Sequence, residues 1–273
     1  MDYLHLIIYI IAGAFGGFMA GMLGVGGGIV FIPIIQEIAK KTAAPEDLSF
    51  YEIANSLAIV LVVGISGSYK QYKLKNTDIK SAVFTGLFAI FSSQIVTWVL
   101  HEFELNNHNV FKTIYAVILV ITGLRMWYSR KQIENESKID EIQLPGIAAL
   151  FPAGTFAGII TAITGLGGGV VMVPYFNKIL KLPLKFSTGL SLSVIPIIAA
   201  PMLVTYMFKS PVKEVFPGLQ TGYLMWTAII PLIIAAGITS PLGVRVANKI
   251  SSKTLLFIFM SFIAVNLLKI VFF

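Results

Sequence analysis

The chain has 273 residues, of which 56% are hydrophobic and only 12% are charged. A soluble domain typically carries about 25% charged residues, so this chain lacks the charges to cover a water-facing surface. Because long apolar runs recur from end to end, the sequence predicts a multi-pass membrane protein without a separate soluble domain. The chain has no cysteine, which excludes disulfides, thiolate metal sites and cysteine nucleophiles. Its net charge of +7 fits loop lysines and arginines that set orientation in the membrane, and we expect no nucleic-acid partner.

The first half of the chain holds five apolar runs. Residues 3–23 form the first run, which we interpret as a retained membrane span because no basic leader or cleavage site marks a signal peptide. A glycine-rich stretch at residues 24–28 follows and opens a short run that ends near Ala39. The remaining runs cover residues 48–68, 79–100 and 110–128.

A charged stretch separates this half from a second half with the same order of runs. The second half contains runs at residues 145–164, 165–180, 186–208, 219–244 and 255–273. We therefore predict a first repeat at residues 1–128, a charged linker at residues 129–144 and a second repeat at residues 145–273.

One ten-residue motif appears in both halves. The first glycine motif reads GVGGGIVFIP at residues 24–33, and the second reads GLGGGVVMVP at residues 165–174, an offset of 141 residues. The same offset relates small residues spaced four apart in the preceding runs: Gly13, Gly17 and Gly21 correspond to Gly154, Gly158 and Ala162. Small residues at this spacing let membrane helices approach closely. The shared offset indicates an internal duplication.

Five segments per half is an odd number, so the second half is expected to insert upside down relative to the first. Six lysines and arginines fall on the side of the two termini and fourteen on the other side. The positive-inside rule then places the linker in the cytoplasm and both termini outside. The expected fold is an all-α polytopic membrane protein with two inverted-topology repeats of five segments, each with a short glycine-broken helix pair.

The glycine motifs are the main candidate site. The segment after each motif amounts to roughly 20 Å of helix, whereas the hydrocarbon core is roughly 30 Å thick, so the glycine loops are expected to dip into the membrane. Backbone N–H groups that converge at a helix N-terminus form a cradle for an anion. The expected substrate-binding glycines are Gly24, Gly26, Gly27, Gly28, Gly165, Gly167, Gly168 and Gly169, with Pro33 and Pro174 in structural roles. The alternative is that each glycine triplet is only a tight turn between packed helices.

Two copies of Gly-x-Gly-Gly-Gly-x4-Pro, each followed by a segment that opens near a small polar–Ser–Leu group, resemble the sulfite exporter TauE/SafE family of membrane permeases. The resemblance covers essentially the whole chain. It implies transport of small sulfur-containing or organic anions, such as sulfite, sulfonates or sulfoacetate, across the bacterial cytoplasmic (inner) membrane. A secondary anion transporter is therefore expected; an anion channel of the same fold and a non-transporting accessory subunit are the alternatives.

The Ser-Leu element supplies candidate side-chain donors to the anion. It reads ANSLAIV in the first half and GLSLSVI in the second, which makes Asn55, Ser56, Ser191 and Ser193 candidate substrate-binding residues. Leu190 stands where Asn55 would align, so the two halves are not expected to contribute equally. The alternative for each serine is a bond to the carbonyl four residues back in its own helix.

Glu52 opens the third run on the same helix face as Asn55, and it is the candidate carrier of a coupling proton. The alternative is a solvated glutamate at a helix end, and a coupling sodium ion is also left open. Aspartate occurs only at Asp2, Asp47, Asp78 and Asp140, outside the expected spans, so we expect no enzyme. We expect no cofactor and no metal, since the histidines lack metal-ligand spacing.

Overall fold

The computed structural model describes residues 3–40, 47–103, 110, 113–114, 116–121, 123–124, 143–211 and 219–272. Part of the expected fifth run (residues 111–112, 115, 122 and 125–128) and nearly all of the expected linker lie outside the described residues. The elements are α1 (Tyr3–Leu23), α2 (Gly28–Ala39), α3 (Leu48–Lys73), α4 (Ile79–Glu102), α6 (Ile147–Thr164), α7 (Gly169–Pro174), the π-helix η2 (Tyr175–Ile179), α8 (Leu184–Phe208), β1 (Gln220–Thr221), β2 (Leu224–Met225), α9 (Trp226–Lys249) and α10 (Ser252–Phe272).

Six of the described helices are long and apolar enough to cross a membrane: α1, α3, α4, α6, α8 and α9. The shorter apolar helix α2 has 12 residues and α7 has six, so neither spans a hydrocarbon core of roughly 30 Å. The expectation of an all-helical chain with several spans and two short helices is confirmed. The observed ends of the first four helices lie within a few residues of the predicted runs.

The structure differs from the expected elements at two places in the second half. The run expected from Leu219 begins as a β-hairpin, in which Gln220 pairs with Met225 and Thr221 with Leu224, and α9 starts only at Trp226. The second short helix changes from α to π geometry directly after Pro174, whereas α2 continues through Pro33 to Ala39. Both copies carry the proline, which lacks the amide hydrogen that continues an α-helical ladder, so the proline alone does not set the change of geometry after Pro174.

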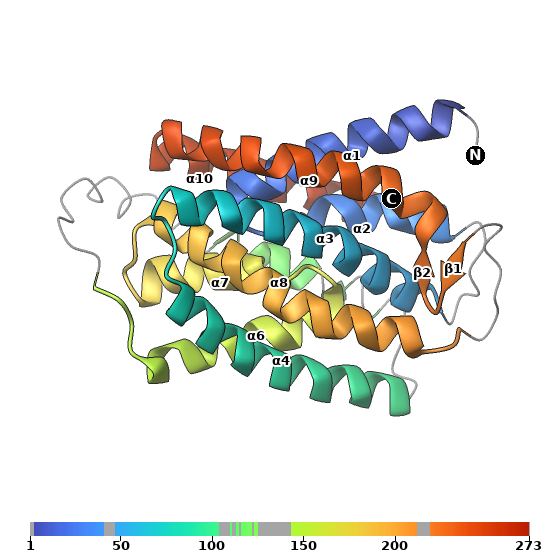
Figure 1. Ribbon diagram of the computed structural model, residues 1–273, viewed down its shortest axis with the longest axis horizontal. Helices are drawn as coiled ribbons and strands as arrows, with labels where there is room; N and C mark the ends of the chain where they lie inside the picture. Colours follow the sequence, from blue (N-terminus) through green and yellow to red (C-terminus); the bar gives the residue numbers. More distant parts are fainter. Residues whose placement is uncertain are drawn as a thin grey trace.

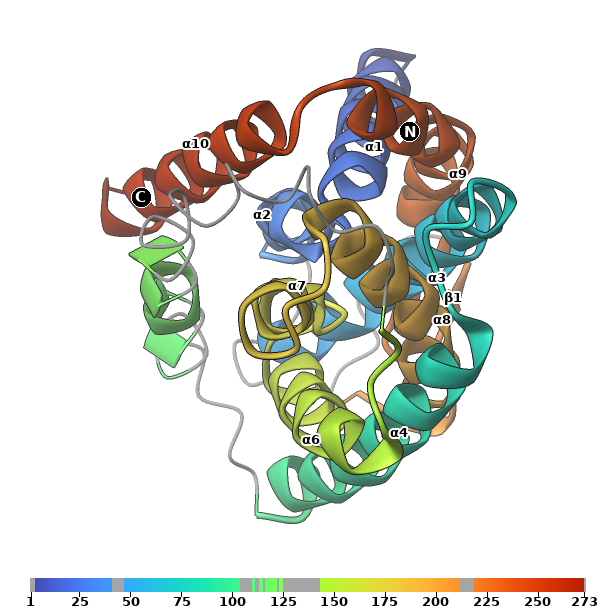
Figure 2. The same cartoon turned by 90° about the vertical axis from the view of Figure 1, so that its left-hand side faces the viewer.

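The two short helices lie inside the molecule, where the long helices surround them (Figures 1 and 2). α1 packs along α9, α6 packs along α4, and α3 packs against α8. In the most apolar window of α3, 83% of the residues are buried, compared with 33–50% in the other five spans. α3 is therefore an interior helix, and the site described below is built on it and on α8.

The small residues of α1 and α6 sit at the closest helix contacts. A Cβ atom at Gly17 would lie 2.3 Å from the carbonyl oxygen of Ala236 on α9, and one at Gly158 would lie 2.2 Å from that of Ala89 on α4. The expected glycine faces are thus the packing faces. Residues related by the 141-residue offset make the same kind of contact with different partner helices.

Candidate functional site

The two glycine motifs adopt the same backbone conformation. In the first motif the φ angles of Gly24, Gly26 and Gly27 are 72°, 77° and 85°. In the second motif Gly165, Gly167 and Gly168 have φ angles of 67°, 77° and 72°. A residue with a Cβ atom is strained in this left-handed region, so the motif needs glycine at these three positions in each copy.

The two motifs lie directly against one another. A Cβ atom at Gly28, the first residue of α2, would lie 2.6 Å from the Cα atom of Leu166. The reciprocal contact is equally close, because a Cβ atom at Gly169, the first residue of α7, would lie 2.5 Å from the Cα atom of Val25. Both motifs are buried throughout residues 24–28 and 165–169. The absence of side chains at Gly28 and Gly169 therefore permits backbone-to-backbone contact in the interior.

Each motif is connected by one serine to a helix of the other half of the chain. The Ser56 hydroxyl on α3 donates to the carbonyl oxygen of Gly165 at 3.0 Å, and the Ser191 hydroxyl on α8 donates to that of Gly24 at 2.8 Å. Both serines are fully buried. Neither makes the bond to its own helix that was the alternative for these residues, and both lie at the motifs as expected.

Four buried amide groups of the motifs face no protein acceptor. Within the described part of the chain, the N–H groups of Gly26, Gly27, Gly167 and Gly168 have no hydrogen-bond acceptor. Buried backbone N–H groups without a partner are rare in proteins, because each loses the hydrogen bond that it makes to water. Four such groups lie close together in two motifs that touch.

Two apolar side chains close over the same glycines. Cβ atoms at Gly26 and Gly167 would lie 3.1 Å and 2.8 Å from Val60 Cγ1 of α3, and Ile195 of α8 contacts both positions from the other side. Val60 and Ile195 are fully buried. Sequence reasoning missed both residues, since an apolar residue in an apolar helix carries no signal of its position.

Asn55 lies beside the motif but its side chain is bound to the β-hairpin. Its amide nitrogen donates to the carbonyl oxygen of Tyr51 at 2.7 Å and to that of Tyr223 at 2.8 Å. Its amide oxygen accepts the backbone N–H of Met225 at 2.8 Å. Asn55 is fully buried, so in this structure its hydrogen-bonding groups fasten the hairpin to α3.

Two further side-chain contacts fasten the hairpin at this end of the molecule. The Tyr223 hydroxyl donates to Oδ1 of Asp47 at 3.0 Å, and Nε2 of Gln220 donates to the Tyr51 hydroxyl at 2.7 Å. Burial raises the pKa of the Tyr223 hydroxyl, and the nearby Asp47 carboxylate raises it further. The hydroxyl therefore stays protonated and can donate. We call residues 219–225 with these contacts the hairpin seal.

A second set of contacts lies at the opposite end of the molecule, at the turn between α3 and α4 (Figure 1). Nδ2 of Asn76 donates to Oδ1 of Asn248 on α9. Nζ of Lys185 donates to the Asn248 carbonyl oxygen at 3.0 Å. The turn also packs closely against α8, because a Cβ atom at Gly189 would lie 2.0 Å from the carbonyl oxygen of Asn76. We call residues 74–78 with these contacts the turn seal.

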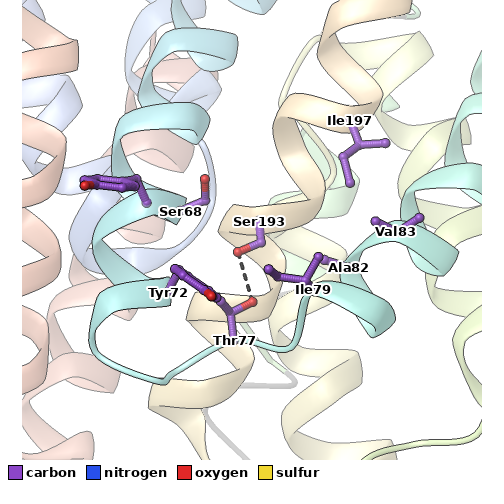
Figure 3. A pocket seen from close by; sticks show the side chains of 9 residues that line it. Ser68, Tyr72, Thr77, Ile79, Ala82, Val83, Ser193 and Ile197 are labelled. Atoms are coloured by element: carbon purple, nitrogen blue, oxygen red, sulfur yellow. Dashed lines mark hydrogen bonds between the residues drawn. The ribbon is translucent and has the colours of Figure 1, made fainter.

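Ser193 does not face the glycine motifs. It lies two residues beyond Ser191 on α8, and two residues rotate a side chain by roughly 200° around an α-helix. Its hydroxyl donates to the Gly189 carbonyl oxygen at 3.0 Å and accepts the Thr77 hydroxyl at 2.9 Å. Figure 3 shows it on the wall of a separate pocket between α3, α4 and α8. The bond to the carbonyl four residues back, the alternative considered for the serines, is the observed one here.

Glu52 is fully buried on α3, one turn before Ser56. The alternative of a solvated glutamate at a helix end is therefore wrong. Among the described residues, no group of three or more histidine and carboxylate side chains could hold a metal ion.

Comparison with known proteins assigns the chain to a family. The family model for the sulfite exporter TauE/SafE matches residues 9–270. A probable membrane transporter protein of Methanocaldococcus jannaschii is 25% identical over 92% of this chain and 90% of its own length. The probable membrane transporter protein YunE of Bacillus subtilis is 24% identical over 93% of both chains, and one of Haemophilus influenzae is 21% identical over 97% of this chain and 98% of its own.

A multi-pass chain of this kind is a membrane transporter, not an enzyme. It belongs to the sulfite exporter TauE/SafE family, as the duplicated glycine motif indicated.

Proposed function

We propose that this protein is a secondary transporter of small anions, which the backbone N–H groups of the two glycine motifs hold between the two halves of the chain. The main support for this proposal is that, among the described residues, the buried N–H groups of Gly26, Gly27, Gly167 and Gly168 have no hydrogen-bond acceptor. Both motifs end in a helix N-terminus, where further N–H groups and the positive helix dipole favour a negative charge. An acceptor-only ligand matches a site that offers donors.

The substrate class proposed is a sulfur-containing or organic anion such as sulfite, a sulfonate or sulfoacetate. The name of the matched family, sulfite exporter, supports an oxyanion of sulfur. Among the described residues, the lysines and arginines in α3, α4, α8 and α9 lie toward the helix ends. Neutral donors bind a dianion less tightly than a partner cation would, which suits a site that must also release its substrate.

The proposed transport mechanism is alternating access between two inverted repeats, residues 1–128 and 145–273, joined by a cytoplasmic linker at residues 129–144. The matching φ angles and the reciprocal Ser56 and Ser191 bonds support this arrangement. The hairpin seal and the turn seal close opposite ends, so opening one at a time would expose the motifs to one side of the membrane.

Glu52 is proposed to carry the coupling proton. It is buried on the helix that also carries Ser56 and Asn55, so a change in its charge would act close to the motifs and to the hairpin seal. Burial of a carboxylate favours its neutral form, which can cross between the two sides without a charge.

The proposed location is the bacterial cytoplasmic membrane, with both termini outside. The excess of lysine and arginine on the linker side supports this orientation. Single cysteines introduced into this cysteine-free chain test it: an impermeant maleimide should label Thr221→Cys in intact cells and Leu74→Cys only in inverted vesicles. The reverse pattern would show the opposite orientation.

Flux into liposomes tests the proposed function. The purified protein is reconstituted and offered sulfite, sulfate, thiosulfate, sulfonates and short carboxylates, and we expect saturable uptake of at least one. Alanine at a positive φ costs about 1–2 kcal/mol, and at Gly26 the atoms nearest to its methyl group would be side-chain carbons, Ile195 Cδ1 at 3.0 Å and Val60 Cγ1 at 3.1 Å. Gly26→Ala and Gly167→Ala should therefore fold and lower the flux about tenfold, the factor given by about 1.4 kcal/mol of lost binding.

Gly146→Ala is the matched control, because a methyl group there meets nothing within 4 Å and the backbone φ is −66°. Flux through both motif variants equal to that of the control would contradict the proposed anion site. Single-channel currents would identify the protein as a channel, and no uptake of any anion would indicate an accessory subunit.

A further inference from the structure

A pocket of about 280 Å³ lies between the end of α3, the start of α4 and the middle of α8 (Figure 3). It is on the opposite face of α8 from the glycine motifs, since Ser193 and Ile197 line it whereas Ser191 and Ile195 contact the motifs. The pocket is therefore separate from the proposed anion site. Its lining residues are Ser68, Tyr69, Tyr72, Thr77, Ile79, Ala82, Val83, Ser193 and Ile197.

The serine and threonine hydroxyl groups of this pocket already donate hydrogen bonds within the protein. Thr77 donates to the Ser193 hydroxyl at 2.9 Å, Ser193 to Gly189 at 3.0 Å, and Ser68 to the carbonyl oxygen of Ile65 at 3.1 Å. The rest of the wall is aliphatic side chains and two tyrosine rings. A wall whose serine and threonine donors are already used suits an apolar occupant better than a dissolved anion.

The mouth of the pocket opens on an apolar outer surface. Tyr69, Tyr72, Ile79 and Val83 are 60%, 56%, 56% and 41% exposed, and the exposed face of α4 continues through Leu87. In a membrane transporter, an exposed apolar face of a spanning helix contacts lipid chains. Tyrosines near the helix ends are typical of the level at which chains meet headgroups.

Four lysines lie within the chain segment that lines the mouth or next to its lining residues in sequence. The Lys73 ammonium lies 4.4 Å from the centroid of the Tyr69 ring, and Lys80 is exposed in the first turn of α4 next to Ile79. Residues 69–83 contain four lysines and one aspartate, Asp78, whose carboxylate accepts the Ser81 N–H at 2.7 Å as a helix cap. Basic pockets between spanning helices bind anionic headgroups, because the lysines attract the lipid phosphate.

We propose that this pocket binds one anionic phospholipid, with an acyl chain between α3, α4 and α8 and its phosphate beside Lys73 and Lys80. The apolar wall selects the chain, and the lysines select the headgroup charge. A lipid bound here would touch Thr77 of the turn seal, so it would stabilise that closure. The proposal depends on the membrane setting and on this pocket, and it stands whether or not the glycine motifs bind an anion.

Native mass spectrometry of the purified protein with added lipid tests the proposal. We expect dioleoyl phosphatidylglycerol to be retained about tenfold more strongly than dioleoyl phosphatidylcholine, a ratio equivalent to about 1.4 kcal/mol. Val83→Trp fills the mouth and should abolish retention of this lipid. Leu87→Trp, one turn further along the same exposed face, is the matched control and should bind as the wild type does.

The headgroup contribution is tested separately. Lys73→Ala combined with Lys80→Ala should bind both lipids equally and weakly, whereas Lys249→Ala, an exposed lysine at the end of α9, should keep the preference. If Val83→Trp fails to fold, Ile79→Trp blocks the mouth from its other side. Equal retention of the two lipids by the wild type, or equal retention of phosphatidylglycerol by the blocking variant and the Leu87→Trp control, would overturn the proposal.

Discussion

Asn55 combines three hydrogen bonds in one buried amide, and two of them reach a hairpin about 170 residues away in the chain. An amide side chain offers both donors and an acceptor, so it pairs with a peptide edge as a neighbouring strand would. The carbonyl oxygen of Tyr223 and the N–H of Met225 depend on it for these bonds. At the scale of single residues, the Asn55 side chain therefore binds the hairpin backbone to α3 through two hydrogen bonds.

Replacing this amide should release the hairpin. Asn55→Leu keeps the volume and copies Leu190, the aligned residue of the second half, but leaves one donor and one acceptor of the hairpin unpaired at about 1–3 kcal/mol each. We expect thermal unfolding in detergent about 5 °C below the wild type. Ser68→Ala, whose hydroxyl bonds only a carbonyl three residues back, is the control and should unfold with the wild type. An unchanged midpoint for Asn55→Leu would show that the hairpin does not need these hydrogen bonds.

The two serines at the motifs should respond alike. Ser56→Ala and Ser191→Ala each remove a hydroxyl that donates to a glycine carbonyl of the opposite motif. Because the two environments match, each change should lower the unfolding free energy by about 1 kcal/mol. Thermal melts of the two variants side by side measure this. A large loss in one and none in the other would mean that the two halves of the site are not equivalent.

The sequence predicted the role of a residue where local backbone geometry determines that role. It did not predict roles that depend on contacts with residues far away in the chain. The spacing of the glycine motif predicted two bends, and the structure brings them into contact. Ser56 and Ser191 were placed at the motifs, but their carbonyl partners in the opposite motif were not foreseen. The bonds of Asn55 to the hairpin were missed, since nothing local indicates a contact with Tyr223, and Ser193 lies on the far side of α8.

At the scale of elements, the molecule is held by helix pairs that touch through glycine. α1 meets α9 at Gly17, and α6 meets α4 at Gly158, in each case close to a backbone carbonyl. Without a hydrophobic driving force in lipid, close backbone approach and the dispersion contacts that it permits supply the packing energy. These pairs fix the outer helices against which α3, α8 and the two short helices lie.

A methyl group at these contacts should separate the helices. Gly17→Ala places a Cβ atom 2.3 Å from the Ala236 carbonyl oxygen, a backbone atom that cannot rotate away. Overpacking of this kind costs about 1–3 kcal/mol, so the melting temperature of Gly17→Ala should fall below that of the wild type. The melting temperature of Gly158→Ala should fall by a similar amount. Gly146→Ala again serves as the control. If Gly17→Ala had the same melting temperature as this control, α1 and α9 would not depend on this contact.

The elements themselves were largely predictable, because a membrane span needs a long apolar run and polar breaks mark its ends. The first helix was predicted to its observed ends, and α3 to within five residues. The β-hairpin was missed because its strands have two residues each and its sequence runs directly into the apolar helix that follows. Its contacts are with Asn55 and Tyr51 of α3 and with Asp47 just before that helix, which are all distant in sequence.

At the scale of the whole molecule, the two glycine motifs are buried in the interior. Val60 and Ile195 contact them, the hairpin seal binds α3 at one end, and the turn seal binds α8 and α9 at the other. A transporter that works by alternating access must pass through a closed state, and it must then expose the centre to each side in turn. The account therefore requires that a residue at the centre becomes accessible during transport.

Chemical modification of Val60→Cys in proteoliposomes tests this claim most directly. The natural chain has no cysteine, and Val60 is fully buried against Gly26 and Gly167. A small thiol reagent should modify the introduced thiol, and a saturating concentration of the best-transported sulfonate or carboxylate should slow the modification about tenfold, equivalent to about 1.4 kcal/mol. Potassium chloride of equal ionic strength should not slow it. If the anion leaves the rate unchanged although the variant still transports it, the anion does not bind between the glycine motifs.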